Sequence, residues 1–422
     1  MRAPTFREAL KFWVKLGFIS FGGPAGQIAV MHRELVERKK WIGEPQFLHA
    51  LNFCMLLPGP EATQLAAYCG WLLHGVRGAL AAGILFIVPS IVILWGLSWF
   101  YLMFGAVPAV AAVFHGLKAA VLAIVAVALL RVGRRALKTP TAWGMASVAF
   151  VALYFLHWPF PLIVFGALTV GFVGGRLAPR QFGIGAAKPA GPLAVATPID
   201  WRRIARTTVI GGAVWFAPVV VAGVSLGWGS TYTQLGWFFS KAAVVTFGGA
   251  YAVLPYVAQQ AVENFHWLSA GQMLDGLAFA ETTPGPLIMV VQFVGFVAGW
   301  QHPEGFSLLA GGTLGALITT WVTFVPTYLF ILIGAPLVER AQNDERLKAA
   351  LAAVTAAVVG VILNLTVWFG WHVLLPVSGG VDWFALTLAG GALAVLQWTK
   401  IDLVSVIVAC GAVGFLWERF FL

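Results

Sequence analysis

The sequence predicts an all-α, polytopic membrane protein of two inverted-topology repeats, with helices broken at glycine and proline near the membrane midplane. Composition is the first observation: the 422 residues are 60% hydrophobic and only 10% charged, with a mean hydropathy of +0.88. Soluble domains carry about 25% charged residues, and disordered chains combine low hydrophobicity with high charge. The composition therefore excludes both classes. A transmembrane barrel is excluded because barrels show short alternating segments instead of long apolar runs.

Long apolar runs are the second observation, and each is a candidate to cross the bilayer. A spanning helix needs about 20 mainly apolar residues. We expect nine such helices, at 76–105, 108–130, 141–157, 160–176, 207–227, 307–334, 348–371, 383–398 and 403–420.

The third observation is an internal duplication at an offset of 226 residues. The segment SFGG at 20–23 matches TFGG at 246–249, and PGP at 58–60 matches PGP at 284–286. After a short insertion near 301–307 the offset becomes 237. Several matches in one order indicate a true repeat, which is a frequent plan among transporters.

Loop charges predict how the two halves are oriented. Basic residues crowd 131–138 and 33–40, whereas their counterparts at 361–383 and 258–266 contain no Lys or Arg. Because Lys and Arg collect in cytoplasmic loops, equivalent loops should lie on opposite sides of the membrane. The same placement in short loops argues against a nucleic-acid partner.

The domain organisation follows from these two arguments. We expect an N-terminal membrane repeat at 1–176, a basic cytoplasmic linker at 177–206, and a C-terminal repeat at 207–422 that includes one extra helix at 207–227. The N-terminus should also be cytoplasmic.

The segments around the motifs look different from the spanning runs. Residues 8–21 and 46–57 are short, end at Gly/Pro breaks and have basic flanks, which favours two re-entrant hairpins. Residues 234–257 and 270–299 would repeat the arrangement from the other face. Complete crossings kinked at the same residues are the alternative.

The paired breaks predict an anion site at the midplane. A helix broken in a membrane leaves backbone groups without partners, which is tolerable around a cavity or a ligand. Glycine permits close approach of a ligand, and half-helix N-termini attract anions. Simple kinks or tight turns are the alternative interpretation. The predicted binding residues are Ser20, Gly22, Gly23, Pro58, Gly59, Pro60, Thr246, Gly248, Gly249, Thr283, Pro284, Gly285 and Pro286.

Two lysines occupy equivalent positions inside apolar runs. Lys15 and Lys241 each lie seven residues before a Gly-Gly pair. A lysine in mid-membrane costs about 2.5–3.5 kcal/mol, so it normally faces a cavity or a partner. Two such cations would suit a divalent anion. Snorkelling to the interface is the alternative.

Each half also places a carboxylate at its PGP break, Glu61 in the first and Glu281 in the second. Buried carboxylates can exchange protons near neutrality, so both are candidates for proton coupling. An ordinary first-turn acid and a polar helix end are the alternatives. Further polar residues could line the site or simply join helices, namely Gln27, Asn52, Gln64 and Gln292.

Other chemistries find no support in the sequence. The cysteines Cys54, Cys69 and Cys410 lie in apolar stretches, and no histidine spacing fits a metal site. No nucleotide-binding or catalytic motif occurs in the structural context that such a motif requires. We therefore expect no cofactor, no metal and no enzyme activity, so uphill transport would need an ion gradient or the membrane potential.

At this point the motifs resemble a known family. FGGPAGQIAVMHRELVERKKWI at 21–42 and LLPGPEATQLAAYCGW at 56–71 are similar to the signature region of the chromate ion transporter family. VTFGGAYAVLPYV at 245–257 and AETTPGPLIMVVQFVGF at 280–296 repeat the pattern more weakly. The resemblance implies the long, two-domain form and export of chromate across the bacterial inner membrane by the proton motive force or membrane potential.

The resulting hypothesis is a secondary oxyanion exporter with one midplane site. Chromate and sulfate are both tetrahedral divalent anions, so N–H groups and ammonium charges have little basis for separating them. A passive oxyanion channel of the same architecture and a membrane scaffold without transport are alternatives of other classes. The expected partners are the oxyanion and the lipid bilayer, and the sequence is also compatible with a homodimer.

Overall fold

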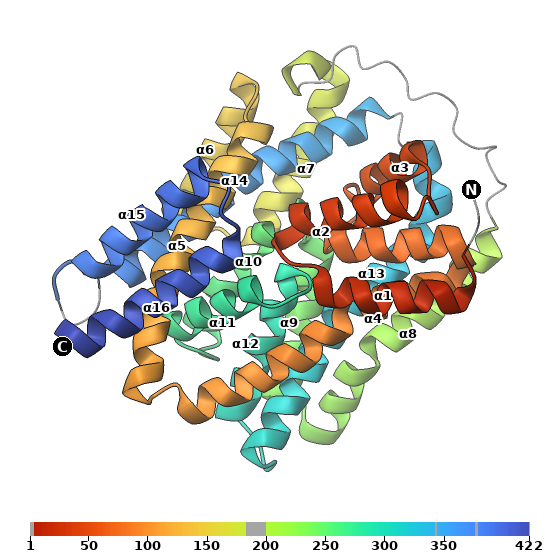
Figure 1. Cartoon of the computed structure of the whole chain (residues 1–422). Helices are drawn as coiled ribbons and strands as arrows, with labels where there is room; N and C mark the ends of the chain where they lie inside the picture. Colours follow the sequence, from red (N-terminus) through yellow and green to blue (C-terminus); the bar gives the residue numbers. More distant parts are fainter. Residues whose placement is uncertain (1–3, 183–199, 342–343, 376–378, 422) are drawn as a thin grey trace.

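The computed structural model of the protein describes residues 4–182, 200–341, 344–375 and 379–421 (Figure 1). All regular secondary structure in these ranges is helical, which confirms the predicted all-α class. Seven of the described helices are long and apolar enough to cross a membrane. The chain is a multi-pass membrane protein.

The first half begins with short helices and ends with longer ones. Its order is α1 (Phe6–Ile19), α2 (Gly23–His32), the π-helical turn η1 (Arg33–Arg38), α3 (Glu44–Cys54), α4 (Glu61–Phe104), α5 (Pro108–Ala136), α6 (Pro140–Tyr154), α7 (Phe160–Leu177) and the 3₁₀ turn η2 (Pro179–Phe182).

The second half follows the same order after one added helix, α8 (Trp201–Leu226). With the offset of 226 residues, α9 and α11 begin and end within two residues of α1 and α3, and a π-helical turn again follows the second short helix. Its elements are α9 (Thr231–Val245), α10 (Ala250–Gln259), η3 (Gln260–Asn264), α11 (Ala270–Thr282), η4 (Leu287–Met289), α12 (Val290–Gln301), α13 (Leu308–Ala341), α14 (Glu345–Leu374), α15 (Trp383–Trp398) and α16 (Leu403–Phe421).

The short helices of each half are paired as hairpins. The chain leaves α2 and returns to α1, because the rings of Trp41 and Phe12 lie 5.4 Å apart between centroids. The next hairpin ends beside the same place, with His74 Nε2 3.0 Å from the Pro4 carbonyl oxygen. In the second half the Thr231 N–H likewise donates to Glu304 at 2.6 Å, which brings the end of α12 back to the start of α9.

Glycine permits a tight turn where the second hairpin of each half is followed by its long helix. α4 turns back on itself at Gly75, whose φ of 59° is accessible at little cost only to glycine. A Cβ on Gly70 would lie 2.3 Å from the Gly78 carbonyl oxygen. The α12–α13 hairpin has the same contact, since a Cβ on Gly299 would lie 2.2 Å from the Gly311 carbonyl oxygen.

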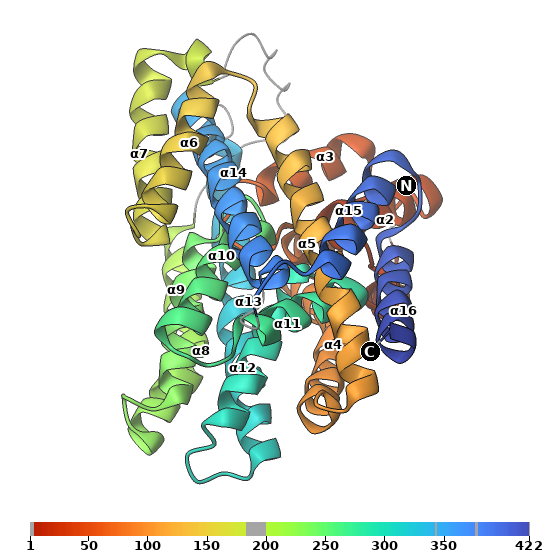
Figure 2. The same cartoon turned by 90° about the vertical axis from the view of Figure 1, so that its left-hand side faces the viewer.

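The helices gather into two groups that each contain parts of both sequence halves. The motif bundle comprises α1–α4 and α8–α13, and the flank bundle comprises α5–α7 and α14–α16. Within the flank bundle α6 and α7 pack on α14, whereas α15 and α16 pack on α5, as both views show (Figures 1 and 2). The two sequence halves therefore interlock and cannot separate as two bodies.

Several helix boundaries differ from the sequence prediction, and two of the predicted spanning helices are short for that role. α5 continues past residue 130 to Ala136, because two arginines in its last turn suit the negative end of the helix dipole. α8 starts at Trp201, inside the predicted linker, where the Asp200 side chain caps it by accepting from the Arg203 N–H at 3.1 Å. α6 ends at Tyr154, three residues before its predicted end, whereas α15 has its predicted bounds. Both are short for spanning helices. Of the linker, 183–199 lies outside the described residues.

Candidate functional site

A cavity of about 230 Å³ lies where the motif bundle meets the flank bundle. The FGG breaks of both sequence halves face it, through Gly22 and Gly23 on one side and Gly248 and Gly249 on the other. Helices α5 and α14 close the remaining sides. Its polar and charged lining consists of Glu61, Arg131, Arg135, Tyr251, Glu281 and Thr355.

All six motif glycines have the backbone conformation that makes them necessary. The φ values are 87° and 67° in the first FGG, 82° and 90° in the second, and 126° and 108° at Gly59 and Gly285. Residues with a Cβ are strained at such positive φ. The sequence pattern therefore marks real breaks in the helices.

The breaks of one half are hydrogen-bonded to those of the other. The Gly59 N–H donates to the Thr246 carbonyl oxygen at 2.7 Å, and the Gly285 N–H donates to the Ser20 carbonyl oxygen at 2.8 Å. These two bonds are equivalent under the 226-residue offset. Each PGP break thus supports the FGG break of the opposite half.

Two helix N-termini begin at the cavity. α2 starts at Gly23 and α10 at Ala250, and neither N-cap residue contributes a side-chain cap. Uncapped first-turn N–H groups and the positive end of the helix dipole stabilise an anion. The cavity therefore has an edge, made by backbone from both halves, whose uncapped N–H groups could stabilise an anion.

Four ionisable side chains add charge to this backbone site. Arg131 and Arg135 are four residues apart on α5, so they share one helix face. Arg135 interacts electrostatically with Glu61 and Arg131 with Glu281. Glu61 from the first half lies beside the second FGG, since a Cβ on Gly249 would be 3.7 Å from Oε1.

Glu281 is the more buried of the two carboxylates, at 5% exposed. Its Oε1 accepts a hydrogen bond from the Tyr251 hydroxyl at 2.5 Å. Tyr251 lies in the first turn of α10, directly after the second FGG. Glu281 is therefore connected by one hydrogen bond to the first turn of the helix that begins at the second FGG.

A second hollow, of about 300 Å³, adjoins the cavity and shares Met55, Arg135 and Thr355 with it. It extends to Lys138 and Thr139 in the turn between α5 and α6. The basic residues Arg131, Arg135 and Lys138 thus follow one another along the two hollows, and we call this series the basic path.

The other predicted motif residues support the breaks without lining the cavity. The Ser20 and Thr246 hydroxyls both donate back to helix carbonyl oxygens at 2.6 Å, at Leu16 and Ala242. Thr283 caps the end of α11. None of the PGP residues, Pro58, Gly59, Pro60, Pro284, Gly285 and Pro286, is in the lining.

The predicted polar residues divide in a similar way. Gln27 donates to the Gly285 carbonyl oxygen, Gln64 donates to that of Pro58 at 2.7 Å, and Gln292 donates to that of Ile91 at 2.8 Å. These side chains hold the breaks and the neighbouring helix in place. Asn52 is exposed and is not in the cavity lining.

The two predicted lysines lie elsewhere. Lys15 is exposed and lines a separate hollow of about 640 Å³, together with Lys11, Arg38 and Lys39. Lys241 is exposed, with Nζ 5.2 Å from the ring centroid of Trp237. Both placements match the snorkelling alternative, and neither lysine is in the cavity lining.

Three further residues line the cavity but are not among those predicted from the sequence, namely Arg131, Arg135 and Tyr251. The sequence pattern gave the arginines another interpretation. It counted the arginines as loop charges because the apolar run ends at residue 130. Their spacing of four residues was the available signal, since it places two cations on one face of a continued helix. In the described part of the chain no cluster of three or more His, Cys, Asp or Glu side chains could hold a metal ion.

Comparison with known proteins gives consistent results. A family model described as "Chromate transporter" matches residues 7–172 and 233–415. A chromate transport protein of Pseudomonas aeruginosa is 32% identical over 420 residues, covering 98% of this chain and 92% of that protein. A chromate transport protein of Cupriavidus metallidurans is 29% identical over 373 residues, covering 86% and 83%.

A shorter relative is an uncharacterized transporter of Bacillus subtilis, 33% identical over 144 residues, which cover 33% of this chain and 70% of that protein. No solved structure matches. Because the family model covers both sequence halves and the Pseudomonas aeruginosa protein matches nearly end to end, this chain belongs to the chromate transporter family, whose members are membrane transporters and not enzymes.

Proposed function

We propose that the protein is a secondary transporter that exports chromate from the cytoplasm through the cavity between the two FGG breaks. The observation that carries this proposal is the convergence of two uncapped helix N-termini and two arginines on one cavity. Planar guanidinium groups and backbone N–H groups suit the oxygens of a tetrahedral oxyanion. Family membership supplies the identity of the anion.

The charges indicate how binding responds to protons. With Glu61 and Glu281 ionised they offset Arg131 and Arg135, and with both protonated the cavity carries two net positive charges. A divalent oxyanion is therefore bound most strongly when both carboxylates carry protons. This places proton binding and oxyanion binding in one cavity.

The driving force follows from the charge of the substrate. An inside-negative potential of 100 mV expels a divalent anion with about 4.6 kcal/mol, at about 2.3 kcal/mol per charge. The proton gradient adds to this where Glu61 and Glu281 take protons from the opposite side and release them to the cytoplasm after the anion has left, because protons that left together with the anion would oppose export. Export is thus favoured by both components.

The orientation and the moving parts belong to the same proposal. The basic path ends at Lys138, so we place it, the N-terminus and 177–206 on the cytoplasmic side, with the two repeats inverted. A relative of about half this length, in which 144 residues are 70% of the protein, supports the repeat as a unit. Because the sequence halves interlock, alternating access would move the motif bundle against the flank bundle.

The experiment is chromate uptake into everted vesicles that carry Arg135→Gln, with Arg134→Gln as the matched control. Arg134 lies on the same turn of α5 and is exposed, as Arg135 is, but it is outside the cavity lining. A charge-assisted hydrogen bond contributes about 1.5–3 kcal/mol, so KM should rise about 10- to 100-fold in Arg135→Gln only. Equal behaviour of the two variants would contradict the proposal.

Two further arms separate the alternatives. Competition by unlabelled sulfate measures selectivity, and a sulfate KM equal to that of chromate would make this a general oxyanion carrier. Vesicles with an imposed potential or pH gradient should accumulate chromate above equilibrium. Flux that only equilibrates would indicate a passive channel.

A further inference from the structure

The proposed oxyanion site leaves one buried ion pair without a role. Asp275 of α11 accepts a hydrogen bond from the Tyr101 hydroxyl of α4 at 2.8 Å. Lys118 of α5 places Nζ 3.6 Å from the same carboxylate oxygen. The Asp275 side chain is only 3% exposed and that of Lys118 is 29% exposed.

This pair is poorly explained as a structural contact. The second carboxylate oxygen of Asp275, Oδ1, is buried and has no hydrogen-bond partner in the described part of the chain. Aromatic rings surround the site, since Tyr101 packs edge-on against Phe114, Phe279 and Phe293. A buried ion pair with an unsatisfied oxygen is no more stable than apolar packing, and charges retained inside membranes are usually functional.

The pair lies on the side of Glu281 away from the arginines. Asp275 and Glu281 are six residues apart on α11, which is about 9 Å along a helix. Lys118 precedes Arg131 by thirteen residues on α5, which is about 20 Å. Asp275 is thus placed between Glu281 and the end of the molecule opposite the basic path.

Polar groups connect this pair to the surface at that end. The Lys118 ammonium lies at the first turn of α11, since a Cβ on Gly271 would be 3.4 Å from Nζ and 3.8 Å from the Ser269 hydroxyl. The exposed Gln301 amide donates to the Gln272 side chain of the same turn at 3.4 Å. Polar side chains therefore lie beside Lys118 at that end, and Lys118 itself is 29% exposed.

We propose that Asp275 is a second proton-binding site of the transporter, reached from the side opposite the oxyanion cavity, with Lys118 as its internal counter-ion and Tyr101 as a positioning residue. This assignment rests on the proposed function. A proton from water adds to the Asp275 carboxylate while Lys118 remains an ammonium. The proton then passes through water to the Glu281 carboxylate, Asp275 pairs again with Lys118, and no electrons are transferred. Glu281 is thereby protonated when the oxyanion binds, and it releases this proton to the cytoplasm after the oxyanion has left.

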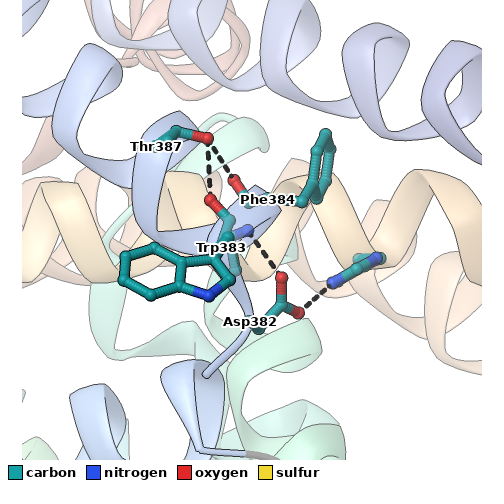
Figure 3. A network of polar contacts seen from close by, with 6 residues as sticks. Asp382, Trp383, Phe384 and Thr387 are labelled. Atoms are coloured by element: carbon teal, nitrogen blue, oxygen red, sulfur yellow. Dashed lines mark hydrogen bonds and ion pairs between the residues drawn. The ribbon is translucent and has the colours of Figure 1, made fainter. Parts of the chain in front are cut away.

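The groups that act on Asp275 are few. Lys118 and Tyr101 are the ones that interact with it electrostatically among the described residues, and α12 carries no titratable side chain. One turn away on α5, His115 Nε2 lies 2.7 Å from Asp382 at the start of α15 (Figure 3). That pair is more exposed, at 37% and 17%, and serves as a matched control.

The experiment compares two chromate fluxes in proteoliposomes that contain the full chain. One is accumulation driven by a pH gradient, and the other is counterflow of labelled chromate without a gradient. Asp275→Asn should lower accumulation at least tenfold and leave counterflow within threefold, and Asp275→Glu should restore accumulation. Asp382→Asn should change neither. Wild-type accumulation in Asp275→Asn, or equal loss of both fluxes, would overturn the assignment.

A second variant covers a failure of Asp275→Asn to reach the membrane. Lys118→Gln removes the cation that opposes proton binding, so the pH of half-maximal accumulation should rise by about one unit. An unchanged pH profile would overturn the assignment. Wild-type vesicles without any chromate flux would instead overturn the proposed function itself, and the two failures are distinguishable.

Discussion

The two sequence halves contribute equal backbone to the cavity but unequal charge. Each half supplies one FGG break, one PGP break and one cross-half hydrogen bond, at 2.7 and 2.8 Å. Both cavity arginines come from α5, whereas its counterpart α14 contributes Leu351, Val354 and Thr355. Duplication thus accounts for the broken-helix scaffold, and the chemistry of the site arises from differences between the copies.

Removing both arginines should have the largest effect on this comparison. The double variant Arg131→Gln, Arg135→Gln loses two charge-assisted contacts, each worth about 1.5–3 kcal/mol, so kcat/KM for chromate should fall more than 100-fold. Vesicle uptake measures it, with Arg134→Gln as control. A loss below fivefold would mean that the symmetric backbone binds the anion alone.

Alanine at the two PGP glycines should break the symmetry of the scaffold. A Cβ on Gly285 would lie 1.8 Å from the Ser90 hydroxyl oxygen, whereas one on Gly59 would meet the end of the Gln64 side chain at 2.9 Å. Strain at positive φ costs about 1–3 kcal/mol at either site. Gly285→Ala should therefore lower the melting temperature in detergent more than Gly59→Ala. Equal melting temperatures would contradict this difference.

Tyr251→Phe removes the hydrogen bond between α10 and Glu281. A bond from a neutral donor to a carboxylate contributes about 1.5–3 kcal/mol, and its loss leaves Glu281 ionised less readily. We expect oxyanion binding to persist to higher pH, with KM at pH 8 about threefold below wild type. Measured KM between pH 6.5 and 8.5, with sulfate as a competitor that stays divalent, checks the sign.

The wild-type protein should bind the oxyanion less tightly as the pH rises over the same range. As pH rises, Glu61 and Glu281 lose protons beside the arginines, so the KM for a divalent anion should increase about tenfold. Glu281→Gln should flatten that profile. A KM that is constant or falls with pH would contradict the role given to the carboxylates.

The smallest effects should come from Lys15→Ala and Lys241→Ala, which are equivalent under the repeat. Both side chains are exposed and outside the cavity, so each variant should keep uptake within about twofold. Chromate uptake reduced to that of vesicles without the protein, in either variant, would indicate that the lysines belong to the binding site.

The repeat and its breaks were readable from the sequence, because glycine at positive φ and proline at helix starts leave a local pattern. Glu61 and Glu281 adjoin the PGP breaks in the sequence, and both line the cavity. The sequence could not decide whether Lys15 lines the cavity, because an apolar run does not indicate which face of α1 points toward it.

Arg131, Arg135 and Asp275 show where sequence reasoning ends. The apolar run ends at residue 130, yet α5 continues to Ala136, and two arginines near its end line the cavity. Asp275 depends on partners 174 and 157 positions earlier, Tyr101 and Lys118, which only the packing of α4, α5 and α11 brings together. Such contacts leave no periodicity in one sequence.

The central claim is that the oxyanion binds between the two FGG breaks at the arginines of α5. Equilibrium binding of labelled chromate to purified protein tests it most directly, with wild type, Arg135→Gln, Arg134→Gln and Lys15→Ala side by side. We predict a Kd at least tenfold weaker in Arg135→Gln alone, with the other two within twofold of wild type. Wild-type affinity in Arg135→Gln together with lost binding in Lys15→Ala would contradict the account.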